Sequence, residues 1–278
     1  MKIAFIGQKG IPAQSGGVEK HVEQLAVRMA QEGHEVSVYV RSHYTEPSLK
    51  EYQGVKLIHV PSIHTKNLDA ITHTFFSTIH ALFRRYDVIH YQSIGPSTLS
   101  FIPKLLKRKT KVLATFHCFD YEHKKWGWFA RTYLRFGEYM ACAVPEKTIA
   151  VSEGLRDHAL KHYGCDAVVI PNGADTVSEV GNDRLEEFGL KEKKYILSVG
   201  RLVKHKGVHY LIKAFEQLEN TNRLSNNFKL VIVGKNAETP EYERYLKVMS
   251  QGRENIVFTG EQTGETLKQL FANAYAFV

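Results

Sequence analysis

Short apolar runs alternate with amphipathic helical patterns along the whole chain. Residues 2–7 form a continuous apolar run, and 18–32 then places apolar residues at the spacing of one helical face. The second half repeats this alternation from 195–199 onward. Strands separated by helices need crossover connections, which give parallel sheets covered by helices on both faces. The sequence therefore predicts an α/β fold with doubly wound, Rossmann-like sheets. The helices predicted in its first half span 18–32, 68–86, 96–108 and 129–143, and a further helix begins at Glu153.

One polar interruption divides this pattern. Pro171-Asn172-Gly173 ends the first series of strands and helices, and a polar tract follows it. A chain of 278 residues is long for a single hydrophobic core and suits two domains. We therefore expect two tandem domains, 1–173 and 191–278, joined by a linker at 174–190. Ligands of such sheets bind beyond the carboxyl ends of the strands, so we also expect a cleft between the domains.

A strand–glycine–cation segment is the main candidate for a ligand site. The run 195–199 stops at Gly200, Arg201 and Lys206 follow it, and Gly207 opens a helical pattern. Glycine lets the backbone approach a ligand, arginine offers a planar fork of donors, and lysine adds a point charge. The helix start supplies free N–H groups for an anion. These features predict a diphosphate clamp, although two solvated cations in an ordinary strand–helix turn would have the same sequence.

Two loops in the first half also follow predicted strands. One brings Gly16 and Gly17 to a helix start, where N–H groups can face an anion, and a flexible loop is the alternative. Its glycine spacing matches neither the dinucleotide fingerprint nor the P-loop. The other loop begins at His117, at the carboxyl end of a strand, where a cleft residue belongs. The acidic and histidine residues after it lack the spacing of a metal site, so no metal is expected. These residues are Asp120, Glu122 and His123.

The charge of the chain limits its partners. A net charge of +8 implies attraction to anions, whether a phosphorylated substrate, anionic lipid or nucleic acid. The sequence has no helix–turn–helix, zinc-finger or RNP-like pattern, so nucleic acid is not expected. One basic amphipathic segment suits peripheral contact with an anionic membrane, although a solvated helix end is the somewhat simpler explanation. That segment contains Phe101, Ile102, Lys104, Leu105, Leu106, Lys107, Arg108, Lys109 and Lys111.

The cysteines and the lack of long apolar segments indicate the compartment. Cys118, Cys142 and Cys165 match no metal or redox spacing, which favours a reducing environment. Residues 1–7 have the pattern of a first strand rather than a signal peptide. No segment has the roughly 20 apolar residues that span a bilayer. We therefore expect a cytoplasmic protein that lies at most at the inner face of the membrane.

Together, in their order and spacing, these motifs resemble a family-4 retaining glycosyltransferase with the GT-B fold, over essentially the whole chain. The loop 117–127 also resembles that of a subgroup that includes rhamnosyltransferases of surface polysaccharides, although Cys118 and Tyr121 replace a glycine and a tryptophan there. The motifs that carry the family resemblance are Gly16-Gly17-Val18-Glu19, Gly33-His34-Glu35-Val36, His117, Val151-Ser152-Glu153, Ile170-Pro171-Asn172-Gly173-Ala174-Asp175, Gly200-Arg201 and Lys206-Gly207.

The resemblance implies transfer of a sugar from a nucleoside-diphosphate sugar to a glycan or lipid-linked acceptor, with retention, in cell-surface polysaccharide synthesis. It implies that Arg201 and Lys206 hold the diphosphate and stabilise the leaving group, with no metal or other cofactor. His117 would contact the transferred sugar. The other residues with implied roles are Gly16 and Gly17, which would line the opposite side of the cleft near the phosphate and sugar, Gly200 in the donor site, Asn172 and Gly173 in the interdomain turn, and Ser152 as a helix cap.

One family motif is missing. An E-x7-E sequence that binds the sugar and the ribose would follow the strand that starts at Ala276, and the chain stops at Val278. We therefore interpret the sequence as C-terminally truncated, with an incomplete second domain, prone to aggregation and weak in donor binding and transfer. Other functions stay open: a nucleotide-sugar epimerase of the same fold, a non-catalytic remnant, or a nucleic-acid binder.

Overall fold

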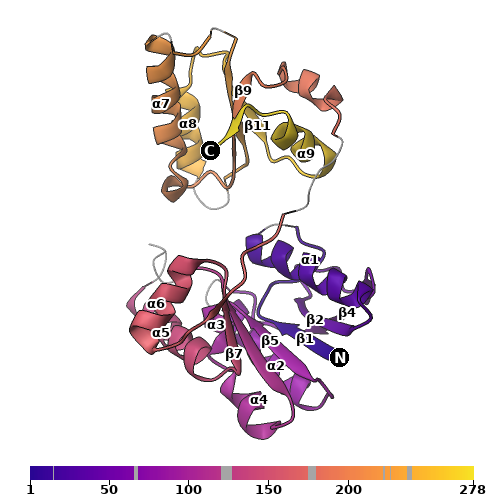
Figure 1. The fold of residues 1–278 in the computed structure, drawn as a ribbon. Coiled ribbons are helices and arrows are strands. Elements are labelled where there is room, and N and C mark those ends of the chain that lie inside the picture. Colours follow the sequence, from indigo (N-terminus) through magenta and orange to yellow (C-terminus); the bar gives the residue numbers. More distant parts are fainter. Residues whose placement is uncertain are drawn as a thin grey trace. The chain divides into compact units, whose positions relative to one another are not determined.

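The structure, a computed structural model, divides into two compact units, Met1–Gly173 (unit 1) and Ala174–Val278 (unit 2) (Figure 1). Each unit is a mostly parallel sheet with helices beside it, so the predicted α/β fold with two Rossmann-like domains is confirmed. The structure describes residues 1–14, 16–65, 68–119, 127–174, 180–221, 223–225, 227–236 and 240–278.

Unit 1 is an eight-stranded sheet in the order β3-β4-β2-β1-β5-β6-β7-β8. All neighbouring strands run parallel except β3 and β4, which form an antiparallel pair. The strands are β1 (Lys2–Ile6), β2 (Glu35–Arg41), β3 (Glu51–Tyr52), β4 (Val55–Val60), β5 (Val88–Gln92), β6 (Lys111–Phe116), β7 (Lys147–Ala150) and β8 (Val168–Val169). The helices are α1 (Gly17–Gln31), α2 (Asp69–Leu82), α3 (Ile94–Ser97), α4 (Phe101–Leu106), α5 (Trp128–Ala143) and α6 (Glu153–Tyr163).

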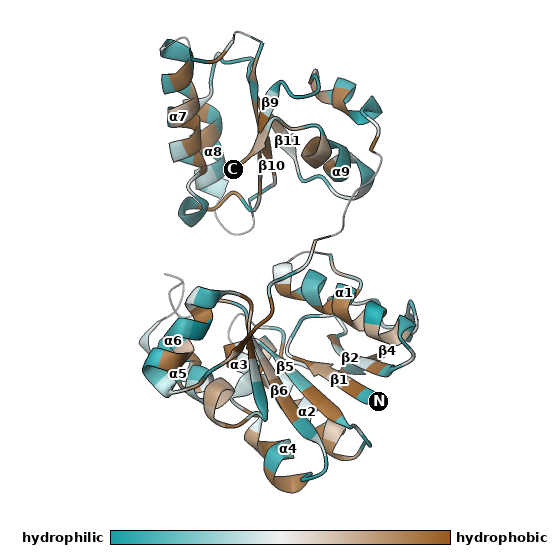
Figure 2. Cartoon of the chain, in the orientation of Figure 1, coloured by the Kyte–Doolittle hydropathy of each residue, from teal (hydrophilic) through white to brown (hydrophobic). Residues whose placement is uncertain are grey.

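Alternating side chains of the strands build a core on each face of this sheet. Ile3 and Phe5 of β1 pack in one cluster with Val22 of α1, whereas Ala4 and Ile6 pack in another with Ala81 of α2. Both faces are therefore covered, which explains why the strands are continuous apolar runs. Hydrophobic residues accordingly concentrate in the strands of both units (Figure 2).

Two local differences from the sequence prediction have physical reasons. A hairpin, β3–β4, turns through Gln53 and Gly54, which both have positive φ and form the tight turn that such hairpins need. The single helix expected at 96–108 is two short helices, α3 and α4. Pro103 has no N–H to bond the carbonyl group of Leu99, and its ring crowds that group, so one continuous helix is disfavoured.

Unit 2 is a four-stranded parallel sheet in the order β11-β10-β9-β12. Its strands are β9 (Tyr195–Val199), β10 (Lys229–Val233), β11 (Ile256–Gly260) and β12 (Ala276–Phe277). Its helices are α7 (Val208–Asn220), α8 (Pro240–Met249) and α9 (Gly264–Ala272), with 3-10 turns η2 (Asp183–Phe188) and η3 (Lys204–Lys206). Leu230 and Ile232 of β10 pack against α7 and α8, and Val231 and Val233 pack with Leu270 of α9.

Part of the expected linker, 174–190, is instead packed on the second sheet. Leu185 of η2 and Leu190 are buried in the core that contains Tyr195 and Leu270. The backbone N–H of Arg184 donates to Oε1 of Gln269 at 2.9 Å. Residues 183–190 therefore belong to unit 2, because their leucines cover one face of its sheet.

Two glycines let β9 and β10 end very close together. Gly234 has φ +142°, and a Cβ added to it would lie 1.9 Å from the carbonyl oxygen of Gly200. The Gly200 amide also donates to the carbonyl oxygen of Val233. Only a residue without a side chain fits at position 234, so this contact fixes the carboxyl edge of the second sheet.

We predict that Gly234→Ala destabilises unit 2 by roughly 3 kcal/mol or more, from backbone strain and the clash with Gly200. Gly252→Ala is the matched control: Gly252 also has positive φ, but its Cβ would enter open space. Gly252→Ala should lower the free energy of unfolding by only about 1 kcal/mol, the cost of positive φ at a residue with a side chain. Urea denaturation of both variants measures the difference, and equal costs would show that the close approach to Gly200 is unimportant.

Candidate functional site

Unit 2 has a hollow of about 240 Å³ at the carboxyl ends of its strands. Gly200 and Arg201 reach it from the end of β9, and Val233 from the end of β10. Lys206, the last residue of η3, lines it from the turn that precedes α7. The structure thus brings together the three residues that the sequence predicts as a diphosphate clamp, Gly200, Arg201 and Lys206.

The two cations of this hollow are available to a ligand. Arg201 and Lys206 are exposed, and neither forms an ion pair with a carboxylate among the described residues. The neighbouring backbone is held, because the Leu202 amide donates to the carbonyl oxygen of Lys235 and the Lys206 amide to that of Val203. A guanidinium and an ammonium held beside a glycine-ended strand suit the oxygens of a phosphate group.

Unit 1 places His117 directly after β6, at the carboxyl edge of its sheet. A nitrogen of its ring, Nε2, lies 2.9 Å from Oε1 of Gln92, the last residue of β5. The ring of His21, from α1, meets it edge-on with 4.9 Å between centroids. The side chain of Asn172 acts on His21 and offsets part of the lowering of the His21 pKa by burial. His117 and Asn172, both predicted site residues, are therefore brought to the same histidine.

Burial keeps these histidines neutral at pH 7. Burial, with a smaller contribution from the nearby His21, lowers the pKa of His117 to about 4. His90, fully enclosed in β5, has its pKa lowered to about 3 by burial and by His21 and His117. Its Nε2 lies 2.7 Å from Oγ1 of Thr115. A neutral imidazole offers one donor and one acceptor, so His117 is suited to bind hydroxyl groups rather than anions.

The start of α1 is shaped by a carboxylate of its own chain. Gly16 has φ +103° and precedes the helix without a side-chain cap. A Cβ at Gly16 would lie 2.1 Å from Oε2 of Glu19, whose Oε1 accepts the Lys9 amide at 3.1 Å. Glu23 accepts the Ala13 amide at 2.5 Å. These contacts hold the loop before α1 against the helix, and the Glu19 carboxylate already lies in the first turn, where an anion was expected.

Sequence reasoning missed His21, His90 and Gln92, which complete the surroundings of His117. A signal was present, because His90 and Gln92 are polar residues two apart in an otherwise apolar strand and so share one face. His21 lies four residues after Gly17, on the same side of α1. The implied cap is confirmed, since Oγ of Ser152 accepts the Leu155 amide at the start of α6.

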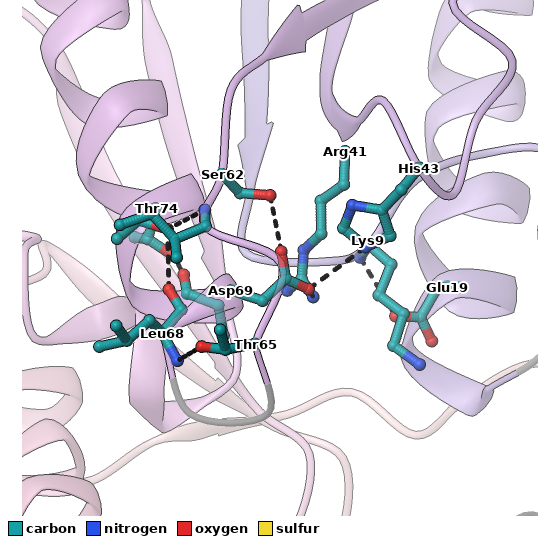
Figure 3. A network of polar contacts seen from close by, with 12 residues as sticks. Lys9, Glu19, Arg41, His43, Ser62, Thr65, Leu68, Asp69 and Thr74 are labelled. Carbon is teal, nitrogen blue, oxygen red and sulfur yellow. Dashed lines mark hydrogen bonds and ion pairs between the residues drawn. The ribbon is translucent and has the colours of Figure 1, made fainter.

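A second polar cluster, centred on Asp69 at the start of α2, was also missed (Figure 3). Nη1 of Arg41 donates to Asp69 at 2.7 Å, and Ser62 Oγ donates at 2.6 Å. Burial alone would raise the pKa of Asp69, but the Ser62 hydrogen bond and the Arg41 charge lower it. Nε2 of His43 lies 3.3 Å from Oδ2 of Asp69, and the His43 ring stacks on that of His64. The buried ion pair ties the end of β2 to the start of α2.

Some of the residues discussed from the sequence lie outside the part of the chain that the structure describes. Asp120, Glu122 and His123 lie outside the described residues, as does Asp175 of the interdomain motif. Within the described ranges, histidine, cysteine and carboxylate side chains form no group of three that would hold a metal ion. None of the helices in the part of the chain that the structure describes is long and apolar enough to cross a bilayer.

The comparison with known families settles the class of the protein. Residues 15–178 match the model of Glycosyltransferase Family 4, and residues 182–278 match that of Glycosyl transferases group 1. The chain therefore belongs to Glycosyltransferase Family 4, as the sequence motifs predicted.

Individual relatives agree with this assignment. An uncharacterized glycosyltransferase of Methanocaldococcus jannaschii is 28% identical over 99% of this chain and 73% of its own length. A phosphatidyl-myo-inositol mannosyltransferase of Mycolicibacterium smegmatis is 29% identical over 73% of this chain and 52% of its own. The crystal structure of Anabaena HepE in complex with UDP and glucose superimposes with a TM-score of 0.72, at 20% identity, over 100% of this chain and 73% of its own. This likeness shows the GT-B fold.

The partly buried His117 predicts a pH dependence of the free energy of unfolding. In the folded chain it stays neutral down to about pH 4, whereas unfolded histidine takes up a proton near pH 6.5. Stability that is fully present above pH 6.5 is therefore lost as the pH falls toward 4. The free energy of unfolding should therefore fall less with decreasing pH in His117→Gln, by roughly 2–3 kcal/mol, because glutamine takes up no proton.

Urea denaturation of both proteins between pH 8 and pH 4.5 measures this effect. Above pH 7 the two curves should differ by a constant offset, and they should converge or cross as the pH falls. Parallel curves over the whole range would show that His117 is protonated as readily in the folded chain as in the unfolded one.

Proposed function

We propose that this protein transfers a hexose or deoxyhexose from a nucleoside-diphosphate sugar to a glycan or lipid-linked acceptor. The observation that carries the proposal is the hollow of unit 2, where Gly200, Arg201 and Lys206 meet at the carboxyl ends of the strands. A related fold has been solved with UDP and glucose bound, and a relative is named a phosphatidyl-myo-inositol mannosyltransferase. These names support a nucleotide-sugar donor and a lipid-linked acceptor.

In this proposal unit 2 supplies the charge chemistry of the reaction. Arg201 binds two diphosphate oxygens through its planar fork, and Lys206 neutralises charge on the leaving group as the glycosidic bond breaks. No metal or other cofactor takes part, because two cations and the nearby helix start supply the positive charge. The product keeps the anomeric configuration of the donor through front-side attack, in which the protein provides no nucleophile.

Unit 1 supplies the polar groups that contact the sugar. His117, kept neutral by burial and positioned by Gln92, hydrogen bonds to a hydroxyl of the transferred sugar. Asn172 holds the His21 ring that packs on His117. Gly17 leaves open space at the start of α1, and the Glu19 carboxylate beside Gly16 suits sugar hydroxyls better than phosphate. We place the reaction in the cytoplasm, at the inner face of the membrane, in synthesis of a cell-surface polysaccharide.

A donor screen tests the proposed function. The protein is incubated with UDP-, GDP- and dTDP-sugars and a range of glycan and lipid-linked acceptors, and release of nucleoside diphosphate is measured. One donor should give acceptor-dependent release with an α- or β-linkage matching that of the donor. Release without acceptor would indicate hydrolysis or epimerisation, and no turnover with any donor would contradict a transferase.

Substitutions in the hollow test the clamp. We expect Arg201→Ala and Lys206→Ala each to lower turnover by on the order of 100-fold, the effect of losing one preorganised charged donor. Both side chains are exposed, so thermal stability should stay the same. Lys204→Ala is the matched control, since Lys204 is an exposed lysine of the same turn that does not line the hollow. Near-normal turnover in either clamp variant would exclude that residue from the donor site.

A further inference from the structure

The end of α2 and the end of α4 form one continuous surface of unit 1. The ammonium group of Lys107, just after α4, donates to the carbonyl oxygens of Arg84 and Ala81 at the end of α2. Thr110 donates through Oγ1 to the carbonyl oxygen of Tyr86 at 2.8 Å. A lysine at a helix C-terminus satisfies carbonyl groups that have no partner in the helix. We call residues 83–85 and 105–109, which these contacts hold together, the α2/α4 surface.

Large apolar side chains of this surface are exposed. Phe83 is 83% exposed, and Leu105 and Leu106 are 68% and 69% exposed. Phe101, at the start of α4, is 38% exposed. A single exposed leucine needs no explanation, but several apolar side chains on two tethered segments leave a patch that water solvates poorly. Figure 2 shows hydrophobic residues in both α2 and α4 at this end of unit 1.

Cations border the apolar side chains. Arg84, Arg85, Arg108 and Lys109 are exposed, and none of them forms an ion pair with a carboxylate in the described parts of the chain. The nearby carboxylates are already engaged, because Glu146 binds Lys104 at 2.7 Å and Asp87 accepts the amide of Lys2. Lys104 and Lys107 are therefore structural, and the charge available to a partner lies on Arg84, Arg85, Arg108 and Lys109.

We propose that the α2/α4 surface binds an anionic lipid bilayer, with Phe83, Leu105 and Leu106 entering the interface and the arginines and Lys109 contacting lipid headgroups. Apolar side chains among unpaired cations suit a membrane that is apolar below and negatively charged above. A second copy of the chain fits this surface less well, because the cations of the two copies would face and repel each other. The proposal deepens the proposed function by naming the surface that would hold the enzyme beside a lipid-linked acceptor.

The position of this surface leaves the candidate site of unit 1 open. Residues 83–85 and 105–109 precede β5 and β6, so they lie at the edge where these strands begin. His117 follows the last residue of β6, at the opposite edge. A strand of this length spans roughly 20 Å, so a bilayer can contact the α2/α4 surface without covering His117.

Vesicle sedimentation tests the proposal without any donor or acceptor. The full chain is centrifuged with vesicles of phosphatidylcholine alone or with about 30% phosphatidylglycerol added, which gives them the negative surface charge of an anionic membrane. Each mixture is measured at low and at high salt. We expect binding to the anionic vesicles only, and weaker binding at high salt because headgroup charge is screened.

Matched variants locate the binding surface. Arg108→Gln with Lys109→Gln should lower the partition coefficient about 10- to 30-fold at low salt, as expected for two headgroup cations. Leu105→Ser with Leu106→Ser should also weaken it by about 10-fold or more. The charge control is Lys213→Gln with Arg244→Gln, and the apolar control is Tyr245→Ser with Val248→Ser, all exposed in unit 2. Both controls should bind as the unchanged protein does.

Three outcomes would overturn the proposal: no binding to anionic vesicles, equal binding by the surface variants and the unchanged protein, or equal loss in the controls. A concentration-dependent dimer that Leu105→Ser with Leu106→Ser converts to a monomer would instead assign the surface to a second copy. Failure of the donor screen alone would leave the membrane result standing, because the vesicle experiment uses no sugar nucleotide. The variants should keep nucleoside-diphosphate binding, which lies in unit 2.

Discussion

Burial of both faces of parallel strands is the constraint on which the rest of this structure depends. In β1, Ile3 and Phe5 pack with one set of helices and Ala4 and Ile6 with the other. The same division holds in β10, where alternate residues join two separate cores. Because neither face of a strand meets water, polar residues that act on a ligand must lie where the strands end.

The carboxyl edges of the two sheets meet this constraint with different chemistry. In unit 2 the edge carries exposed cations, Arg201 and Lys206, beside a glycine-ended strand. In unit 1 it carries His117, His21 and Gln92, held by burial in uncharged form and by hydrogen bonds and ring contacts. Exposed charge therefore gathers at the edge to which we assign the diphosphate, and neutral hydrogen-bonding groups gather at the edge to which we assign the sugar.

Several buried polar groups in unit 1 serve to hold the edge in place. Glu19 and Glu23 of α1 accept amides of the loop that follows β1, and the Arg41–Asp69 pair ties β2 to α2. Buried charges are costly unless paired and hydrogen bonded, and here each carboxylate meets a donor. At the other end of the same sheet, Lys107 similarly joins α2 to α4 and leaves their apolar and cationic side chains facing water.

The sequence by itself determined the alternation of strands and helices, the parallel sheets and the residues that follow each strand, because periodicity and glycine positions are local signals. It also placed Gly200, Arg201 and Lys206 in one turn, since they are close along the chain. It could not place His90 and Gln92 beside His117, because β5 and β6 pair only in the folded sheet. It also could not assign 183–190 to the second core, because only tertiary packing decides which face Leu185 and Leu190 cover. The split of α3 from α4 did have a local signal in Pro103, which the helical periodicity of 96–108 masked.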